Sequence, residues 1–85
     1  MTMTYRLTDH RYGDTYDNLT IDSLERRLKL LFDTAEIIDT HIIAGFVVDI
    51  TAGAMIESLC RAVSTDDMKA QAEAEYLLDV SVCRQ

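Results

Sequence analysis

The sequence lacks proline and tryptophan, and its 85 residues include only three glycines and two cysteines. Without proline, nothing in the chain forbids long helices. Cys60 and Cys83 allow at most one disulfide, and no positively charged, apolar leader is recognisable before the predicted fold. We therefore expect a reducing, cytoplasmic setting in which both cysteines are ordinary thiols.

Basic residues are also scarce, because eight Lys and Arg stand against 15 Asp and Glu, a formal net charge of -7. A surface that binds nucleic acid gains affinity from clustered Lys and Arg, which displace counterions from phosphates. We therefore expect no direct contact with nucleic acid. The acidic balance is compatible with a basic partner, or with a protein that only needs solubility.

Signatures of catalysis, cofactor binding and metal binding are missing. His10 and His41 are far in sequence from either cysteine, and no Cys or His pair has the spacing of zinc ligands. Residues 14–25 place acids at several positions of an EF-hand loop, but Leu19 occupies the place that requires glycine. The three glycines do not form a phosphate-binding loop. We expect no enzyme, no metal and no cofactor.

The chain is organised around one apolar stretch, residues 37–63, and no Lys or Arg occurs between Leu30 and Cys60. A membrane-spanning helix needs about 20 predominantly apolar residues. Asp39, Asp49 and Glu57 interrupt the stretch too often for that, so no membrane insertion is expected. We expect the stretch to be buried or paired at the centre of the fold.

Residues 41–51 within this stretch fit two kinds of secondary structure. As a helix, the stretch places Gly45, Asp49 and Gly53 on one stripe, where small residues permit a close crossing with another helix. We expect these three residues to contact a second copy across a symmetric dimer; alternatively, the stripe faces water. As a strand, the segment is rich in β-branched residues. The helical pattern on both sides favours the helix, and the strand is the alternative.

The flanking segments predict further helices. Thr20 is a suitable N-cap, and apolar residues recur in steps of three and four from Ile21 to Ile42. Ser64 and Asp67 indicate another helix start before a segment of strong helix formers. The prediction is a mainly α fold, a bundle of about three helices with an N-terminal extended arm. Because so short a chain has a marginal core, we expect dimerisation to complete it.

Both ends of the chain alternate between apolar and polar residues, over residues 1–8 and 75–82. We assign residues 1–18 to an N-terminal arm or loop that could include a short strand, and residues 19–85 to a helical domain. In the alternative, the two terminal segments pair as strands and the fold is α+β.

These properties predict a small, acidic, non-enzymatic protein that binds and modulates a host or cellular protein. Short, acidic chains without catalytic motifs are common among inhibitors encoded by viruses and mobile elements. Aromatic residues contribute disproportionately at protein interfaces, so Tyr5, Tyr12 and Tyr16 are the expected protein contacts. The alternative is an acidic mimic of nucleic acid that inhibits a DNA- or RNA-binding protein.

Overall fold

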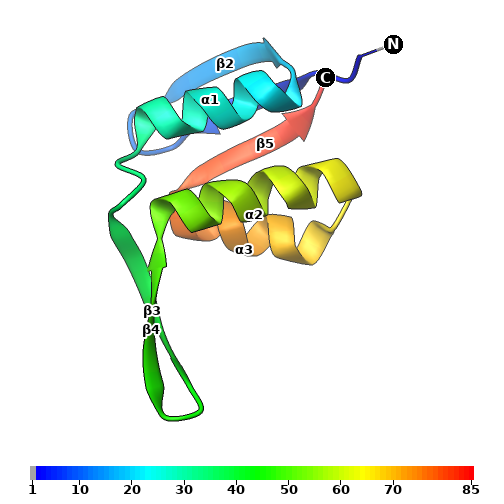
Figure 1. The fold of residues 1–85 in the computed structure, drawn as a ribbon. Helices are drawn as coiled ribbons and strands as arrows, with labels where there is room; N and C mark the ends of the chain where they lie inside the picture. Colours follow the sequence, from blue (N-terminus) through cyan, green and yellow to red (C-terminus); the bar gives the residue numbers. More distant parts are fainter. Residues whose placement is uncertain (1) are drawn as a thin grey trace.

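The computed structural model of the protein describes residues 2–85. These residues form five strands and three helices, in the order β1 (Tyr5–Asp9), β2 (Asp14–Leu19), α1 (Ile21–Leu31), β3 (Ile37–Ile43), β4 (Phe46–Thr51), α2 (Ala52–Thr65), α3 (Met68–Leu78) and β5 (Val80–Arg84). The strands form one three-stranded antiparallel sheet, ordered β2-β1-β5, and one separate β3–β4 hairpin (Figure 1). The fold is therefore α+β.

The predicted mainly α, helical fold is wrong, and the alternative with paired terminal strands is confirmed. β1 is the central strand of the sheet and pairs with β5, with Leu7 opposite Val82 and Arg6 opposite Cys83. The residues expected to form an N-terminal arm instead supply β1 and β2, and Tyr5 and Leu7 lie in the same core as the helices. The alternating pattern dominates here because a strand with a neighbour on each side satisfies its backbone and buries one face.

The predicted helix over residues 41–51 is also wrong, because the chain reverses direction there. Ala44 and Gly45 both have positive φ, 51° and 84°, and Ile43 pairs with Phe46 across them. Two consecutive residues with positive φ form the tight turn that matches the twist of a β-hairpin. Stiff, β-branched side chains on both sides of the turn favour extended backbone.

Side-chain caps determine where the helices begin. Thr20 accepts a hydrogen bond from the Ser23 N–H at the start of α1, as the sequence predicts, and Thr51 does the same for α2. The cap of α3 is Asp67, so α3 begins at Met68 and not at the predicted Ser64. α1 ends at Leu31, so the apolar pattern that runs on to Ile42 continues through a loop and into β3.

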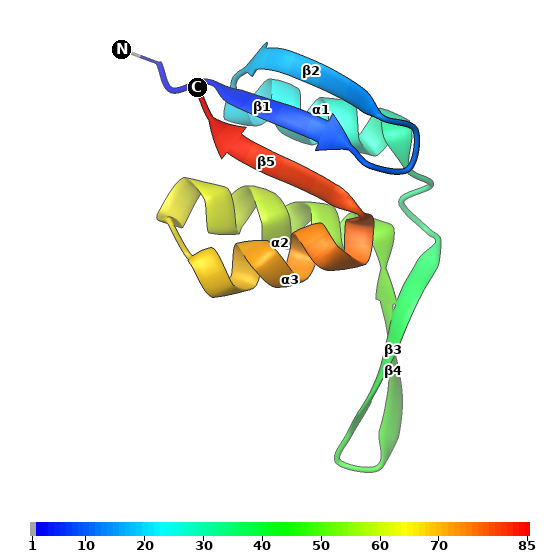
Figure 2. The same cartoon turned by 180° about the vertical axis from the view of Figure 1, so that it is seen from behind.

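All three helices and the three-stranded sheet share one core. α1 packs on β1 and β2, α3 packs on β5, and α2 packs on both other helices. Figure 2 shows β1 in front of α1 when the molecule is seen from behind. The core side chains come from every one of these elements except β2, and the fully buried ones among them include Leu7, Leu24, Leu28, Ile56 and Leu59.

Candidate protein-docking site

The β3–β4 hairpin projects from the body that the helices and the larger sheet form (Figures 1 and 2). Every residue from 40 to 49 is exposed, and partly buried residues occur only toward the base of the hairpin. The apolar stretch expected at the centre of the fold is therefore divided. Its second half forms the buried side of α2, and its first half stands in solvent.

The end of the hairpin is apolar on both faces. Ile43 is opposite Phe46 on one face, and Ile42 is opposite Val47 on the other. The exposed fractions are 77% for Ile42, 75% for Phe46, 67% for Val47 and 57% for Ile43. We call these four residues the apolar tip. A two-stranded hairpin alone is marginally stable in water, and a contiguous exposed apolar patch typically marks an interaction site.

Behind the apolar tip, one face of the hairpin carries an acid and an imidazole. The Nε2 atom of His41 lies 2.8 Å from Oδ2 of Asp39. The Thr40 N–H donates a hydrogen bond to Oδ1 of the same carboxylate, at 2.9 Å. The Thr40 amide and the His41 imidazole hold the pKa of Asp39 below its usual value. The hairpin also carries Asp49 but no Lys or Arg, so it has acidic groups and no permanent cation.

The base of the hairpin is tied to the loop that follows α1. The Ala52 N–H donates to the Glu36 carbonyl oxygen at 2.8 Å, and the Gly53 N–H donates to the Thr34 carbonyl oxygen at 2.9 Å. A Cβ atom on Gly53 would lie 2.9 Å from that Thr34 oxygen, so the close approach requires glycine. The body therefore holds the base in place while the tip is exposed.

The predicted dimer contacts do not share a helical stripe. Gly45 is in the turn of the hairpin, Asp49 is on β4, and Gly53 is in the first turn of α2 against Thr34. The stripe requires one continuous helix, and the reversal at Gly45 removes it. Contact of these residues with a second copy stays a prediction.

The three tyrosines predicted as protein contacts lie in different surroundings. Tyr5 is in the core, and its hydroxyl lies 3.7 Å from the sulfur of Met3. Tyr16 is partly buried, with the Arg27 guanidinium 4.7 Å from the ring centre. Tyr12 is 71% exposed in the turn between β1 and β2. None of them is on the β3–β4 hairpin, so the structure does not bring them together with the apolar tip.

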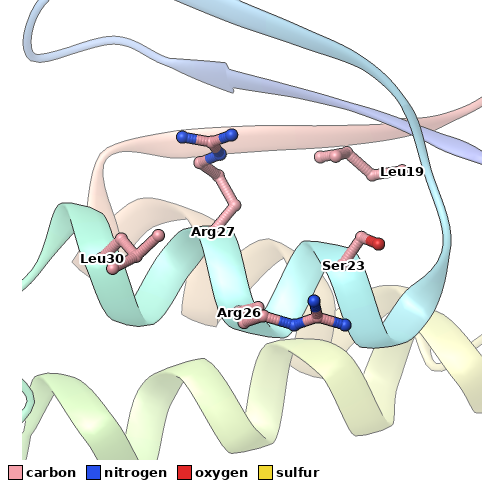
Figure 3. A pocket seen from close by; sticks show the side chains of 5 residues that line it. All are labelled: Leu19, Ser23, Arg26, Arg27 and Leu30. Carbon is pink, nitrogen blue, oxygen red and sulfur yellow. The ribbon is translucent and has the colours of Figure 1, made fainter.

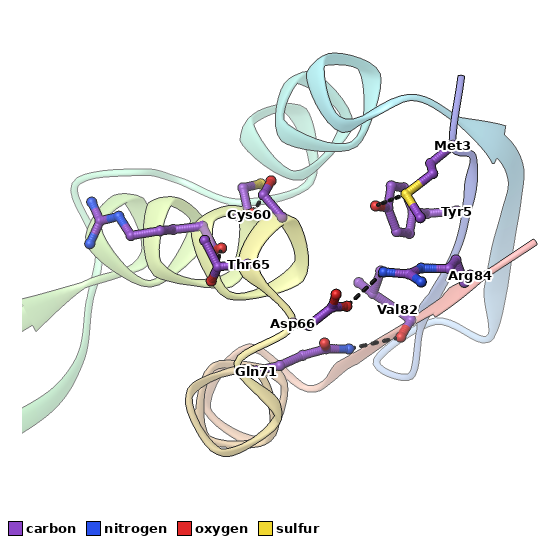
Figure 4. A network of polar contacts seen from close by, with 10 residues as sticks. Met3, Tyr5, Cys60, Thr65, Asp66, Gln71, Val82 and Arg84 are labelled. Atoms are coloured by element: carbon purple, nitrogen blue, oxygen red, sulfur yellow. Dashed lines mark hydrogen bonds and ion pairs between the residues drawn. The ribbon is translucent and has the colours of Figure 1, made fainter. Parts of the chain in front are cut away.

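Two of the hollows on the body are lined by polar and apolar side chains. The first, about 220 Å³, lies between α1 and the end of β2 and is lined by Leu19, Ser23, Arg26, Arg27 and Leu30 (Figure 3). The second lies between β5 and the turn that joins α2 to α3. Its polar groups bond to one another, because Arg84 pairs with Asp66 at 2.6 Å and Gln71 donates to the Val82 carbonyl oxygen (Figure 4).

Neither hollow gathers the groups that chemistry on a bound molecule would need. Within residues 2–85, every buried side-chain nitrogen and oxygen has a hydrogen-bond partner. No three His, Cys, Asp or Glu side chains in that range lie close enough together to hold a metal ion. The apolar tip is therefore the better candidate for a functional surface.

No family model, curated protein or solved structure matches this chain. In the described part of the chain, no helix has both the length and the apolar character that crossing a bilayer requires.

Proposed function

We propose that this chain is a small, non-enzymatic protein-binding modulator that docks on a host or cellular protein through the β3–β4 hairpin. The observation that carries the proposal is the apolar tip: four large apolar side chains, exposed on both faces of a hairpin whose base is tied to the body. Removing such side chains from water is the main favourable term in most protein association.

The charge of the hairpin defines the chemistry of the partner. Asp39 and Asp49 flank the apolar tip, and no Lys or Arg occurs between residues 30 and 60. We infer that the partner is a protein with an apolar groove and a rim of Lys or Arg, because complementary charge speeds encounter and fixes register. An anionic membrane surface would repel the same acids, so it is the less favourable occupant.

The shape of the molecule suits an inhibitor. With the hairpin in a groove, the compact body would cover the surface beside that groove and exclude other ligands. The short, acidic chain fits inhibitors encoded by viruses and mobile elements, and we propose that role for it. The nucleic-acid mimic is not put forward, because Asp9, Asp17 and Asp66 are each paired with an arginine of the same chain.

The cysteines support a reducing, cytoplasmic setting as part of this proposal. Cys60 and Cys83 are both free thiols, and Cys83 is exposed. An exposed free thiol is compatible with a compartment that keeps thiols reduced.

The test compares capture of a partner by the wild type and by a tip variant. The tip variant is Phe46→Ser with Val47→Ser, and the matched control is Leu30→Ser with Tyr76→Ser, which removes two apolar side chains exposed elsewhere. Each tagged chain is passed through a nuclease-treated lysate. We expect one protein that the wild type and the control retain at stoichiometric amounts and that the tip variant loses.

Binding is then measured with the purified partner. The tip variant should weaken affinity about 100-fold or more, because central apolar anchors contribute most of the energy at an interface. Equal binding by the tip variant would overturn the proposal. A steep loss of wild-type affinity with salt, together with tolerance of the tip variant, would favour the mimic instead.

A further inference from the structure

The sequence of β3 has mirror symmetry about Thr40. Residues 37–43 read Ile-Ile-Asp-Thr-His-Ile-Ile, the same in both directions except that Asp39 mirrors His41. When two copies of a strand pair antiparallel about a twofold axis, each residue faces its mirror position in the other copy. Centred on Thr40, this pairing places Asp39 opposite His41 twice, and isoleucine opposite isoleucine at all four remaining positions.

The edge of β3 that would make this pairing is unpaired. β3 has β4 as its one neighbour in the described residues, in a sheet of two strands that projects clear of the helices (Figure 1). An exposed strand edge is a ready template for another chain, and proteins usually protect it with Lys, Pro or a bulge. β3 has neither Lys nor Pro, and its irregularity between Ile37 and Asp39 lies at the base. From Asp39 to Ile43, β3 therefore has a regular edge without these protective features.

The backbone direction at Thr40 fits the same register. In a hairpin with a two-residue turn, the residues that flank the turn exchange hydrogen bonds, here Ile43 and Phe46. In a strand, the N–H and C=O groups of successive residues point to opposite edges. Those of Ile43 point to β4, so those of Thr40 and Ile42 point toward the free edge of β3. The Thr40 N–H agrees with this direction, because it bonds to the Asp39 side chain and not to β4, and pairing would exchange this bond for one to the Thr40 carbonyl of the second copy.

Charge selects among the registers that these outward peptide groups allow. A twofold axis at Ile42 would place His41 opposite Ile43 and leave Asp39 beyond the paired residues, and an axis at His41 would place the two imidazoles opposite each other and Asp39 opposite Ile43. An axis at Thr40 places Asp39 of each copy directly opposite His41 of the other, on the same face of the sheet. A protonated His41 then faces a carboxylate of opposite charge and a neutral His41 can donate a hydrogen bond to it, whereas like charges at directly facing positions destabilise a strand pair.

We propose that this chain forms a symmetric homodimer in which the β3 edges of two copies pair antiparallel about Thr40. The result is a four-stranded sheet ordered β4-β3-β3-β4, with the two bodies at opposite ends. Ile42 and Ile43 of one copy then lie beside Ile38 and Ile37 of the other. A sheet of four strands can be stable by itself, whereas a two-stranded hairpin is marginal. Pairing would therefore stabilise the projecting hairpin.

The dimer goes beyond the proposed function and does not compete with it. Pairing uses the β3 edge and brings Ile42 and Ile43 beside the base of the other copy, while the outer edge of β4 stays open. Phe46 and Val47 are on β4, away from the new pairing. The dimer would therefore present two tips on one sheet and bind a repeated or dimeric partner with avidity.

The test measures self-association of the purified full chain by sedimentation velocity over a range of concentrations. Asp39→Arg places an arginine opposite His41 in both pairs, which removes the attraction and repels a protonated imidazole. The dimer dissociation constant should rise about tenfold or more. Asp39→Arg combined with His41→Asp restores opposite charges across the axis and should recover the dimer. Asp49→Arg, on β4, is the matched control and should leave the dimer intact.

A crosslink locates the axis independently of stability. In a Cys83→Ser background, Thr40→Cys places two thiols opposite each other at the axis, where Cα atoms about 5.5 Å apart suit a disulfide. Mild oxidation should give a covalent dimer, while Asp49→Cys in the same background should not. Circular dichroism of each variant shows that it is folded.

Three results would overturn the dimer. The wild type could sediment as a monomer at every concentration, the charge exchange could fail to restore association, or the Thr40→Cys chain could stay uncrosslinked while a dimer forms through another surface. Each leaves the proposed function testable, because the Phe46→Ser, Val47→Ser variant changes the apolar tip and not the β3 edge. A monomeric Thr40→Pro chain lacks the outward N–H but keeps Asp39 and the apolar tip, so its retention of the partner would separate the two proposals.

Discussion

The carboxylate of Asp9 is fully buried and receives three hydrogen bonds from Arg11, at 3.0 Å from the main-chain N–H, 3.1 Å from Nε and 3.0 Å from Nη2. The same Nη2 atom also donates to the Leu31 carbonyl oxygen at the end of α1. The guanidinium lies 3.8 Å from the ring centre of Phe32. Arg11 thus joins the β1–β2 turn to the end of α1, just before the chain enters the hairpin.

Replacing Asp9 with Asn should lower the free energy of unfolding by about 2 kcal/mol, because the Arg11 guanidinium would lose a buried, charged acceptor. Urea denaturation measures this loss. Asp14→Asn is the matched control, since Asp14 is exposed on β2, and it should change stability by about 0.5 kcal/mol at most. Equal losses in the two variants would mean that the pair contributes nothing particular.

The same pair predicts how stability depends on pH. Burial raises the pKa of Asp9, but the hydrogen bonds and charge of Arg11 outweigh burial and lower it overall. The pair therefore stabilises the fold fully above the pKa of an unfolded aspartate, about 3.9, and this contribution disappears as pH falls through the lower folded value. Urea denaturation between neutral and acidic pH should show a steeper loss for the wild type than for Asp9→Asn.

Asp39, whose pKa is also lowered, remains in both chains and should give the same residual slope in each. A wild-type slope equal to that of Asp9→Asn would contradict the assignment to Asp9.

The two cysteines should differ in reactivity. Burial, with a smaller effect from the charge of Glu25, raises the pKa of Cys60 to about 11, and the thiolate is the reactive form. Cys83 is exposed on β5. A thiol reagent such as Ellman's should therefore modify one thiol quickly and the second only after denaturant is added. The Cys83→Ser chain should lose the fast phase; if it keeps that phase, Cys60 is accessible and the packing of α2 is wrong.

Gly53→Ala should destabilise the protein by about 1–3 kcal/mol, although Ala is intrinsically the better helix former. The new Cβ would meet the Thr34 carbonyl oxygen at 2.9 Å and push the base of the hairpin away from the loop. Ala54→Gly is the control at the next position, which is exposed, and propensity alone should cost it about 1 kcal/mol. Thermal unfolding compares the two, and a stabilised Gly53→Ala chain would show that no close approach exists.

Local patterns in the sequence predicted some of the fold because local physics decides those features. Thr20 caps α1 through its own side chain, and the alternation around Tyr5 and Leu7 reflects a strand with one buried face. The sequence pattern does not predict the hairpin, because an apolar segment is expected to be buried and this one is exposed. The apolar tip has apolar residues on both faces, which removes the period of two that identifies a half-buried strand. Only the paired β-branched segments on each side of Gly45 indicated a reversal there.

The site was less predictable than the fold for the same reason. The sequence predicts Gly45 and Asp49 as dimer contacts on a helical stripe, but both lie on the hairpin. It does not predict a role for Phe46 and Val47, which lie between them in the apolar tip. An exposed apolar residue cannot be distinguished from a core residue until the neighbouring elements are placed. Tyr5 shows the opposite case, because the sequence predicts it as an interface contact and the structure places it in the core.

Phe46→Ser should leave stability nearly unchanged, within about 0.5 kcal/mol, because three quarters of the side chain is already in water. Leu28→Ala is the contrasting change: Leu28 is fully buried, and its truncation should cost about 2–5 kcal/mol. Chemical denaturation of the two variants at a concentration where the chain is monomeric tests the premise of the proposed docking on a partner. If Phe46→Ser costs as much as the core truncation, the tip packs inside the molecule in solution and is not available to a partner. If it costs little, the Phe46 side chain stands in water and is available to the partner that the proposed function requires.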